Sequence, residues 1–260
     1  MQIPVRIVLV ETSHPGNIGA AARAMKTMGL FDLALVRPQA FPSDEATARA
    51  SGAADLLERA SVHDSLPDAI ADCGFVVGTS ARARSVEWPT IEPRECAARL
   101  LDAIDAENRT AIVFGPEHSG LTNEALARCA VHVQIPTQPD FSSLNLGMAV
   151  QVLCYELRIA ALERARRTFE RGGERGGSDP DPAHARPRLA TAAELESFHE
   201  HLERVLVESG FLREDHPRQL KLKLRRIFQR AALDRNEIDI LRGVLTSLEP
   251  SRRGPDRSGP

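Results

Sequence analysis

The sequence predicts an α/β protein whose first part is built on a parallel β-sheet. Over residues 1–167, short apolar runs rich in β-branched residues alternate with helix-like stretches. The apolar runs lack the polar–apolar alternation of a half-exposed strand, and most of them end in Gly, Pro, Ser or Thr. Such strands are typical of a parallel sheet that is covered by helices on both faces.

The elements can be placed in order along this part. We expect strands at residues 5–10, 32–36, 74–79, 111–115 and 131–136. We expect helices at residues 17–28, 44–59, 93–106 and 122–129. In the first helix, one apolar stripe should face the sheet: Ile18, Ala21, Ala22, Met25 and Met28. Gly19, Arg23 and Lys26 fall on another face, near the mouth of the preceding turn.

The rest of the chain divides into a linker, a helical extension and a tail. Residues 168–188 are dominated by Gly, Pro and charged residues, which is typical of a flexible linker. Residues 189–249 predict a small helical extension, which starts with the capping residues Thr191 and Glu194 and has a first helix ending at Gly210. A later helix of this extension carries basic residues with no acidic residue among them: Arg218, Lys221, Lys223, Arg225, Arg226 and Arg230. Residues 250–260 are expected to be a disordered tail.

Composition and charge exclude several classes of protein. The chain has 260 residues, 42% of them hydrophobic, which is ample for a buried core. No apolar stretch approaches the roughly 18 residues of a membrane span, and residues 1–13 are expected to form a first strand and no signal peptide. The cysteines are widely spaced and are expected to be buried free thiols in a reducing cytosol: Cys73, Cys96, Cys129 and Cys154. A net charge of −3 does not by itself indicate a nucleic-acid-binding protein.

The connection between the first strand and the first helix is rich in glycine. A strand, a glycine turn and a helix N-terminus are a common means of holding a phosphate. A dinucleotide fingerprint fits poorly, because the spacing is G-x-x-G and Arg37 follows the second strand where an acidic residue is needed. A purely structural turn capped by Asn17 stays open from these residues alone. Asn17 and Arg23 nevertheless offer an amide and a guanidinium that suit a phosphate or a ribose hydroxyl.

Two further segments have the same strand, turn and helix order. They are "IVFGPEHSGLTNEAL" at residues 112–126 and "VQIPTQPDFSSLNLGMAVQVLCYEL" at residues 133–157. The carboxyl ends of parallel strands meet at one edge of the sheet, which is where open α/β sheets bind ligands. The three turns are therefore expected to line one site.

In this order, the three segments resemble the motifs of a known family. "NIGAAARAMKTMG", "FGPEHSGLTNEAL" and "IPTQPDFSSLNLGMAVQVLCYEL" resemble those of the SPOUT methyltransferases, in the branch that methylates ribose 2'-hydroxyls of tRNA and rRNA. The stretches "VVGTSARAR" and "QLKLKLRRIFQRA" are similar to a subgroup that acts on nucleotide 32 of the tRNA anticodon loop. The resemblance covers nearly the whole chain except the linker and the tail.

The resemblance implies a fold and a cofactor. It implies a sheet whose C-terminal part is tied into a deep trefoil knot, S-adenosylmethionine as methyl donor, and no metal. The cofactor-binding residues that it implies lie on three loops: Thr79, Ser80 and Ala81; Gly115, Pro116 and Glu117; and Ile135, Ser142, Ser143, Leu144 and Asn145. The chain departs from the family at Pro116, where arginine is more frequent.

The resemblance also implies catalytic and RNA-binding residues. It assigns catalysis to Arg23, supported by Asn17; since an arginine is always charged, Arg23 is expected to stabilise the developing alkoxide and hold a phosphate and not to act as a base. The RNA-binding residues implied by the resemblance and by the basic helix are Arg82, Arg84, Lys221, Lys223, Arg225 and Arg226. For the basic helix, a solvated face without a partner is the alternative. His14 is either an RNA contact or a turn residue without a role.

The family resemblance further implies a cytoplasmic homodimer that binds tRNA and no membrane. Met148, Val152, Tyr155 and Ile159 recur at helical spacing and form either the dimer face or part of the core. The alternatives are a ribose methyltransferase with another target site and a catalytically silent RNA-binding member. The presence of five family residues argues against the silent alternative: Asn17, Arg23, Glu117, Ser143 and Asn145.

Overall fold

The computed structural model describes residues 1–80, 90–138, 140, 142–172, 188–212 and 218–249. These residues form a seven-stranded sheet of the order β3-β2-β1-β6-β4-β7-β5. The strands are β1 (Val5–Val10), β2 (Asp32–Val36), β3 (Ser61–His63), β4 (Phe75–Thr79), β5 (Thr90–Ile91), β6 (Thr110–Phe114) and β7 (Val131–Val133). All of their pairings are parallel, which confirms the predicted sheet.

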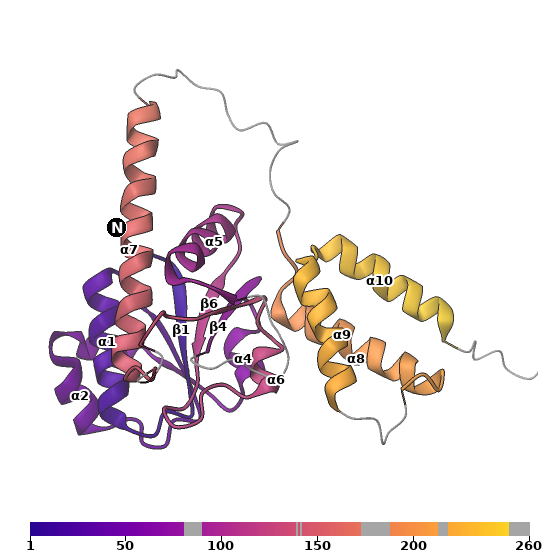
Figure 1. Ribbon diagram of the computed structural model, residues 1–260, viewed down its shortest axis with the longest axis horizontal. Helices are drawn as coiled ribbons and strands as arrows, with labels where there is room; N and C mark the ends of the chain where they lie inside the picture. The colour runs from indigo at the N-terminus through magenta and orange to yellow at the C-terminus, as the bar shows by residue number, and fades with distance from the viewer. Residues whose placement is uncertain (81–89, 139, 141, 173–187, 213–217, 250–260) are drawn as a thin grey trace, which may run out of the picture.

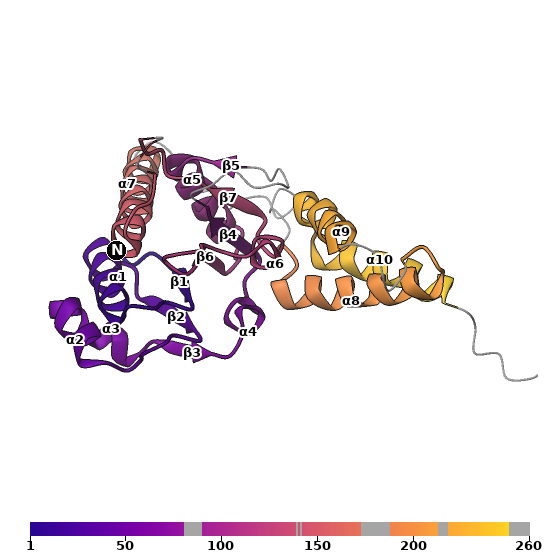
Figure 2. The ribbon, with the colours of Figure 1, turned by 60° about the horizontal axis from the view of Figure 1, so that its bottom comes forward.

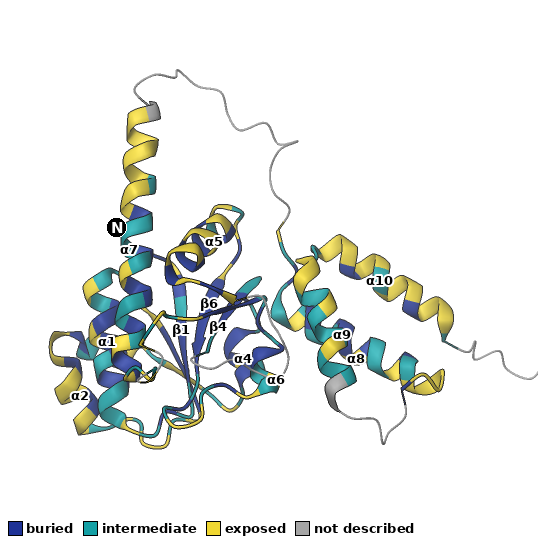
Figure 3. Cartoon of the chain, in the orientation of Figure 1, coloured by how far each residue is buried: buried dark blue, intermediate teal, exposed yellow. Residues whose placement is uncertain are grey.

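Helices cover both faces of this sheet (Figures 1 and 2). The helices of residues 1–172 are α1 (Pro15–Met28), α2 (Asp44–Ala50), α3 (Ala54–Glu58), α4 (Leu66–Ile70), α5 (Pro93–Asp105), α6 (Asn123–Leu126) and α7 (Leu146–Gly172). The larger core cluster joins one sheet face to α1, α2, α3, α5 and α7. The smaller cluster joins the other face to α4 and α6. Figure 3 shows the buried residues in the strands, with the upper half of α7 largely exposed.

The structure corrects three of the predicted boundaries. The helix expected at 44–59 is divided into α2, a 3-10 turn at Ser51–Ala53 and α3, with Ser51 in a left-handed conformation (φ 51°) at the break. Helix α1 begins at Pro15, so His14 occupies the N-cap position, and Asn17 lies inside the first turn without capping it. Helix α7 continues to Gly172, beyond the predicted start of the linker at residue 168.

Helix α1 is held between α2 and α7. Gly19 is buried against α2, not placed at the mouth of the turn as predicted. A β-carbon on Gly19 would lie 2.8 Å from the Ala50 nitrogen and closer still to the Ala46 carbonyl oxygen. Only glycine therefore permits this crossing of α1 and α2. On the other side, Ala20 meets Gly147 at the start of α7.

The C-terminal helices α8 (Ala192–Glu208), α9 (Arg218–Ala231) and α10 (Arg235–Leu248) form a separate hydrophobic cluster. The predicted cap of α8 is confirmed, since Thr191 and Glu194 form a capping box. The start of α8 is attached to the segment after α4: the backbone N–H of Ala192 donates to Cys73 O (2.8 Å). Figure 2 shows the three helices beside α4 and α6.

Candidate functional site

A cleft lies where β4, β6 and β7 end, at the carboxyl edge of the sheet. Its volume is about 890 Å³, including the open mouth. The residues that line it are Thr79, Ser80, Phe114, Gly115, Pro116, Glu117, His118, Ser119, Gly120, Leu121, Val133, Ile135, Thr137, Ser142, Ser143, Leu144, Leu146 and Ala149. The three loops expected to hold a cofactor thus meet in one cleft.

The predicted cofactor residues fall into three groups. Those that line the cleft are Thr79, Ser80, Gly115, Pro116, Glu117, Ile135, Ser142, Ser143 and Leu144. Asn145 does not line it, and Ala81 lies outside the described residues, as do the predicted RNA contacts Arg82 and Arg84. His118, Leu121 and Thr137 line the cleft without having been singled out, although all three stand inside the quoted motifs.

The loop after β6 folds back on Gly115. A β-carbon on Gly115 would lie 2.9 Å from the Gly120 carbonyl oxygen and closer still to the Leu121 nitrogen. The N–H of Gly120 donates to Pro116 O (2.8 Å), and Gly120 itself has a positive φ of 66°. The wall of the cleft at this point is therefore backbone, which leaves its peptide groups close to any bound molecule.

The Glu117 side chain joins this loop to the start of α1. One carboxylate oxygen accepts hydrogen bonds from the Ser13 N–H (3.0 Å) and the Ser13 hydroxyl (2.9 Å). The other oxygen accepts from the His14 N–H (3.4 Å) and the Asn17 amide (2.7 Å). Ser13 was missed at the sequence level, where its position directly before the glycine turn was the available signal.

These donors determine the charge of Glu117. Burial by itself raises the pKa of the carboxyl, but the hydrogen bonds from Asn17 and Ser13 outweigh it and lower the pKa to about 2. At neutral pH Glu117 is therefore an anion that fixes its neighbours, and it is too weak a base to remove a proton from a hydroxyl group.

Asn17 extends the connection to the third loop. Its side-chain oxygen accepts a hydrogen bond from the Asn145 amide (2.9 Å), and the Asn145 oxygen accepts from the Gly147 N–H at the start of α7 (2.9 Å). Glu117, Asn17 and Asn145 thus connect the three motifs in one hydrogen-bonded chain. Asn17 and Asn145 are each hydrogen-bonded on both sides in this arrangement.

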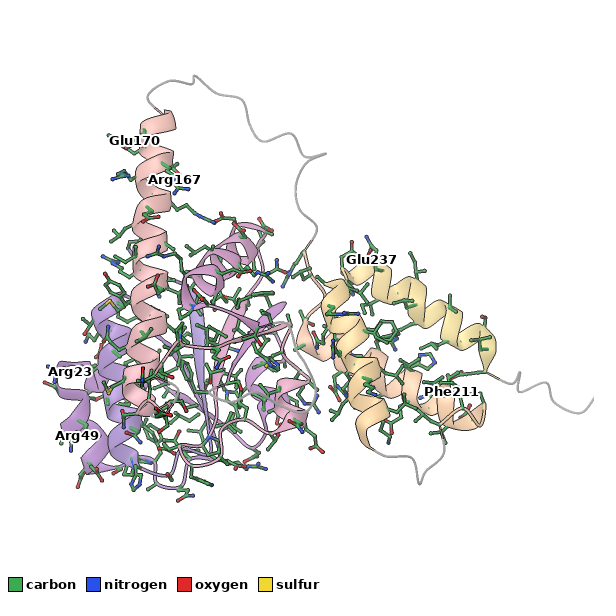
Figure 4. All side chains as sticks on the ribbon, viewed as in Figure 1. Arg23, Arg49, Arg167, Glu170, Phe211 and Glu237 are labelled. Carbon is green, nitrogen blue, oxygen red and sulfur yellow. The ribbon has the colours of Figure 1, made fainter. Side chains whose placement is uncertain are left out.

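Arg23 lies away from this chain. It is exposed on the third turn of α1, it is not among the residues that line the cleft, and Figure 4 shows it on the outer side of α1. The structure therefore brings together Asn17, Glu117 and Asn145, but it does not bring Arg23 into the cleft of the same chain.

The basic residues of α9 differ in their surroundings. Lys221 pairs with Glu203, and Arg225 pairs with Glu196, so the sequence-level view of this cluster as unopposed is wrong for these two residues. Of the predicted RNA contacts on α9, Lys223 and Arg226 have no ion pair with a described residue.

Other expectations concern thiols, metals and membranes. The four cysteines are buried and free, as predicted, and burial raises the pKa of Cys96 to about 12. Within the described part of the chain, no cluster of three or more His, Cys, Asp or Glu residues is suited to a metal ion. Among the described helices, none is long and apolar enough to span a membrane.

A parallel α/β sheet with a backbone-lined cleft at its carboxyl edge is typical of proteins that bind a nucleotide-type cofactor, and comparison with known proteins specifies the class. Residues 4–155 match the model of the SpoU rRNA Methylase family, so the chain belongs to the SpoU methylase family and is a methyltransferase. Residues 193–257 match the model of the C-terminal domain of the tRNA methyltransferase TrmJ.

The similarity to characterised relatives extends over almost the whole chain. The chain is 49% identical over 250 residues to the tRNA (cytidine/uridine/adenosine-2'-O-)-methyltransferase TrmJ of Pseudomonas aeruginosa (strain UCBPP-PA14), covering 96% of this chain and 95% of that protein. It is 48% identical over 254 residues to the tRNA (cytidine/uridine-2'-O-)-methyltransferase TrmJ of Yersinia pestis (strain Pestoides F), covering 97% and 94%. The crystal structure of TrmJ from Z. mobilis ZM4 is similar with a TM-score of 0.79 and 35% identity, covering 95% of this chain and all of that one.

Proposed function

We propose that this methyltransferase transfers a methyl group from S-adenosylmethionine to the ribose 2'-hydroxyl of a cytidine or uridine in tRNA, at nucleotide 32 of the anticodon loop. The observation that carries the proposal is the hydrogen-bonded chain of Glu117, Asn17 and Asn145, which unites the three family motifs at the mouth of the cleft. The relatives named above, which match almost the whole chain, support tRNA as the substrate. We also propose the trefoil knot of the family and a cytoplasmic location.

The cleft suits the proposed cofactor. Leu121, Val133 and Ile135 offer an apolar wall for a base, and the backbone around Gly115 and the hydroxyls of Ser142 and Ser143 offer polar groups. When bound, S-adenosylmethionine supplies a methyl group on a positively charged sulfur, which is already activated for transfer. The protein therefore has to orient the hydroxyl group and stabilise its negative charge.

Arg23 is the proposed source of that stabilisation. Its guanidinium stays protonated, so it donates hydrogen bonds to the ribose oxygen as charge develops there and to an adjacent phosphate. Glu117 holds the start of α1, and thereby Arg23, at a fixed position relative to the cofactor loop. The Arg23→Ala variant should lose methyl transfer and keep cofactor binding; near wild-type transfer would contradict the assignment.

We propose a homodimer in which α7 forms part of the contact. Met148, Tyr155 and Leu162 are seven residues apart on α7 and are 59%, 50% and 46% exposed, although they are large and apolar. Val152 and Ile159 are half-buried between them. Because α1 packs beside α7 and Arg23 is exposed, we further propose that Arg23 of one chain completes the site of the other.

A mixing experiment tests this arrangement. Arg23→Ala chains and Gly115→Ala chains should each be inactive as homodimers, and their mixture should regain activity because each mixed dimer contains one complete site. A mixture that forms mixed dimers and remains inactive would place Arg23 in the site of its own chain.

The proposed activity has a direct test. Unmodified tRNA transcripts are incubated with the protein and S-adenosylmethionine, and 2'-O-methyl groups are mapped by mass spectrometry. We expect one methylated ribose at nucleotide 32, and no ribose methylation on any tRNA would refute the proposal.

A further inference from the structure

The basic residues of α9 lie on two faces of the helix. Lys221, Arg225 and Gln229, four residues apart, face α8 and the catalytic part of the chain. Lys223, Arg226 and Arg230 lie on another face, with the 51% exposed Ile227 among them. These two sets, called below the inner face and the outer face, have different electrostatic surroundings.

The inner face is centred on Glu196 of α8. Arg225 donates two hydrogen bonds to the Glu196 carboxylate, at 2.6 and 2.7 Å. Arg128, just after α6, pairs with the same carboxylate. The side chains of Arg225, Glu196 and Arg128 are 19%, 23% and 24% exposed, so this group is largely withdrawn from water.

The charge state of Glu196 follows from these partners. Burial alone raises its pKa, but the hydrogen bonds and positive charges of Arg225 and Arg128 outweigh burial and lower the pKa to about 2. Both guanidinium groups share one carboxylate of the same chain, which offsets one of their two positive charges. A phosphate would have to compete with Glu196 for the two Arg225 N–H groups that already donate to it.

Arg128 also links this group to the cofactor cleft. It follows α6, and α6 follows the loop Gly115–Leu121 that lines the cleft. Gln229 of α9 donates to the Arg128 carbonyl oxygen (3.3 Å), and Leu126 is fully buried beneath. The inner face therefore attaches α9 to the segment that supports the cofactor loop.

The outer face has the opposite character. Lys223 and Arg230 are exposed, Arg226 is half-exposed, and none of them forms an ion pair with a described residue. Three cations within two helical turns attract a polyanion, because each neutralised phosphate releases a condensed counterion.

We propose that the two faces of α9 have separate tasks. The inner face holds α9 to α8 through the Lys221–Glu203 and Arg225–Glu196 pairs and, because Glu196 also pairs with Arg128, attaches the helical extension to the catalytic part. On the outer face, Lys223, Arg226 and Arg230 bind the RNA backbone. This inference rests on the proposed tRNA substrate only for the identity of the ligand. Of the four α9 residues predicted from the sequence to contact RNA, two, Lys221 and Arg225, are thereby assigned to the attachment instead.

Arg225 and Arg226 are neighbours in the sequence but lie on the inner and the outer face, so their alanine variants form a matched pair; the outer face is tested first. Affinity for an unmodified tRNA transcript is measured by fluorescence anisotropy from 50 to 200 mM salt, with the full-length chain. Arg226→Ala should reduce the slope of log affinity against log salt by about 1, and the Lys223→Ala/Arg226→Ala/Arg230→Ala variant by about 2 to 3. Unchanged slopes in both variants would refute the assignment of the outer face.

Glu196→Gln separates the two tasks, because it frees Arg225 and Arg128 without removing a positive charge. If the inner face is an attachment, hydrogen exchange of α8, α9 and residues 122–129 should accelerate, whatever the change in tRNA affinity, because the substitution also removes a negative charge. If exchange stays unchanged and affinity rises, Arg225 is an RNA contact held back by Glu196, which would overturn the proposal.

The exchange measurement needs no RNA, so it tests the attachment independently of the proposed function. If wild-type protein binds tRNA no better than it binds heparin, the tRNA assignment fails while the attachment result still stands. Arg225→Ala serves as a second test of the attachment and should accelerate exchange in the same segments, whereas Arg226→Ala should not.

Discussion

Replacement of Glu117 by glutamine tests how the catalytic site is held together. The carboxylate accepts four hydrogen bonds from Ser13, His14 and Asn17. A glutamine at this position has one acceptor oxygen, and its NH₂ group would face either the Ser13 donors or the donors of His14 and Asn17. In both orientations a donor meets a donor, and α1 has to move away from the cofactor loop.

The expected magnitude follows from the pKa of Glu117. The difference between an ordinary pKa of 4.5 and a pKa of about 2 favours the folded, ionised state by about 3 kcal/mol at neutral pH. Screening by water at the partly exposed carboxylate reduces this to about 2 kcal/mol. For a chain of this length, such a loss lowers the melting temperature by about 4–8 °C. A displacement of α1 by about 1 Å should lower kcat by about 100-fold.

Two measurements are needed, thermal unfolding and single-turnover methyl transfer. Ser13→Ala is the matched control: it removes one of the four donors and leaves the Ser13 N–H in place, so it should cost about 1 kcal/mol. Glu117→Gln with wild-type melting temperature and wild-type kcat would refute the conclusion that this carboxylate positions α1.

Three further predictions concern the cleft, the packing of α1 and the response to acid. Gly115→Ala should abolish binding of S-adenosylmethionine in calorimetry, because the added methyl group collides with the backbone of Gly120 and Leu121. Gly19→Ala should reduce the free energy of unfolding in urea by about 1–3 kcal/mol, since α1 and α2 have to separate; Gly243→Ala, in open space on α10, should raise it by up to about 1 kcal/mol. Acidification should destabilise the protein in two stages. In the first stage, burial and the charge of Arg225 lower the pKa of His199 to about 4, so the free energy of unfolding falls between about pH 6.5 and 4, where the unfolded chain takes up a proton and the folded chain does not. In the second stage, the carboxylates of Glu117 and Glu196, each with a pKa of about 2, lower the free energy of unfolding again between about pH 4.5 and 2.

Each of these predictions has an outcome that contradicts it. Cofactor affinity that survives Gly115→Ala would show that the loop after β6 can open without loss. A Gly19→Ala variant as stable as wild type would mean that α2 adjusts freely. For the acid response, His199→Leu should remove the stage between pH 6.5 and 4, and a stability curve unchanged by this substitution would assign that stage to other groups.

The sequence predicted the buried strands well because their pattern is local. The strands expected at 5–10 and 32–36 agree with β1 and β2 to the residue. The short edge strands β3 and β5 were missed, since three and two residues carry too little periodicity to be distinguished from loops. The break in the helix expected at 44–59 was also missed. It depends on the positive φ of Ser51, which the residue type does not predict.

The candidate site shows the same division between local and non-local information. Glycines and small polar residues after strands were sufficient to predict the loops that line the cleft. The partners of Glu117 and Arg225 were not predictable, because Ser13 is 104 residues from Glu117 and Glu196 is 29 residues from Arg225. Which charges meet is decided by tertiary packing, and a basic run looks the same in sequence whether or not carboxylates oppose it.

The position of β6 in the sheet has a consequence for the order of folding. Strand β6 lies between β1 and β4, and Val5 pairs with Thr110, so the edge of β1 stays open until more than 100 residues of chain are available. Pairing at such sequence separation is slow, because the entropy of loop closure is lost before the contacts form. The helix that carries Asn17 follows β1, and the loop that carries Glu117, its hydrogen-bond partner, follows β6. The start of α1 and the loop after β6 therefore meet only when β6 enters the sheet. A ligand that needs both of them cannot bind to, and so cannot stabilise, a folding intermediate that precedes this step.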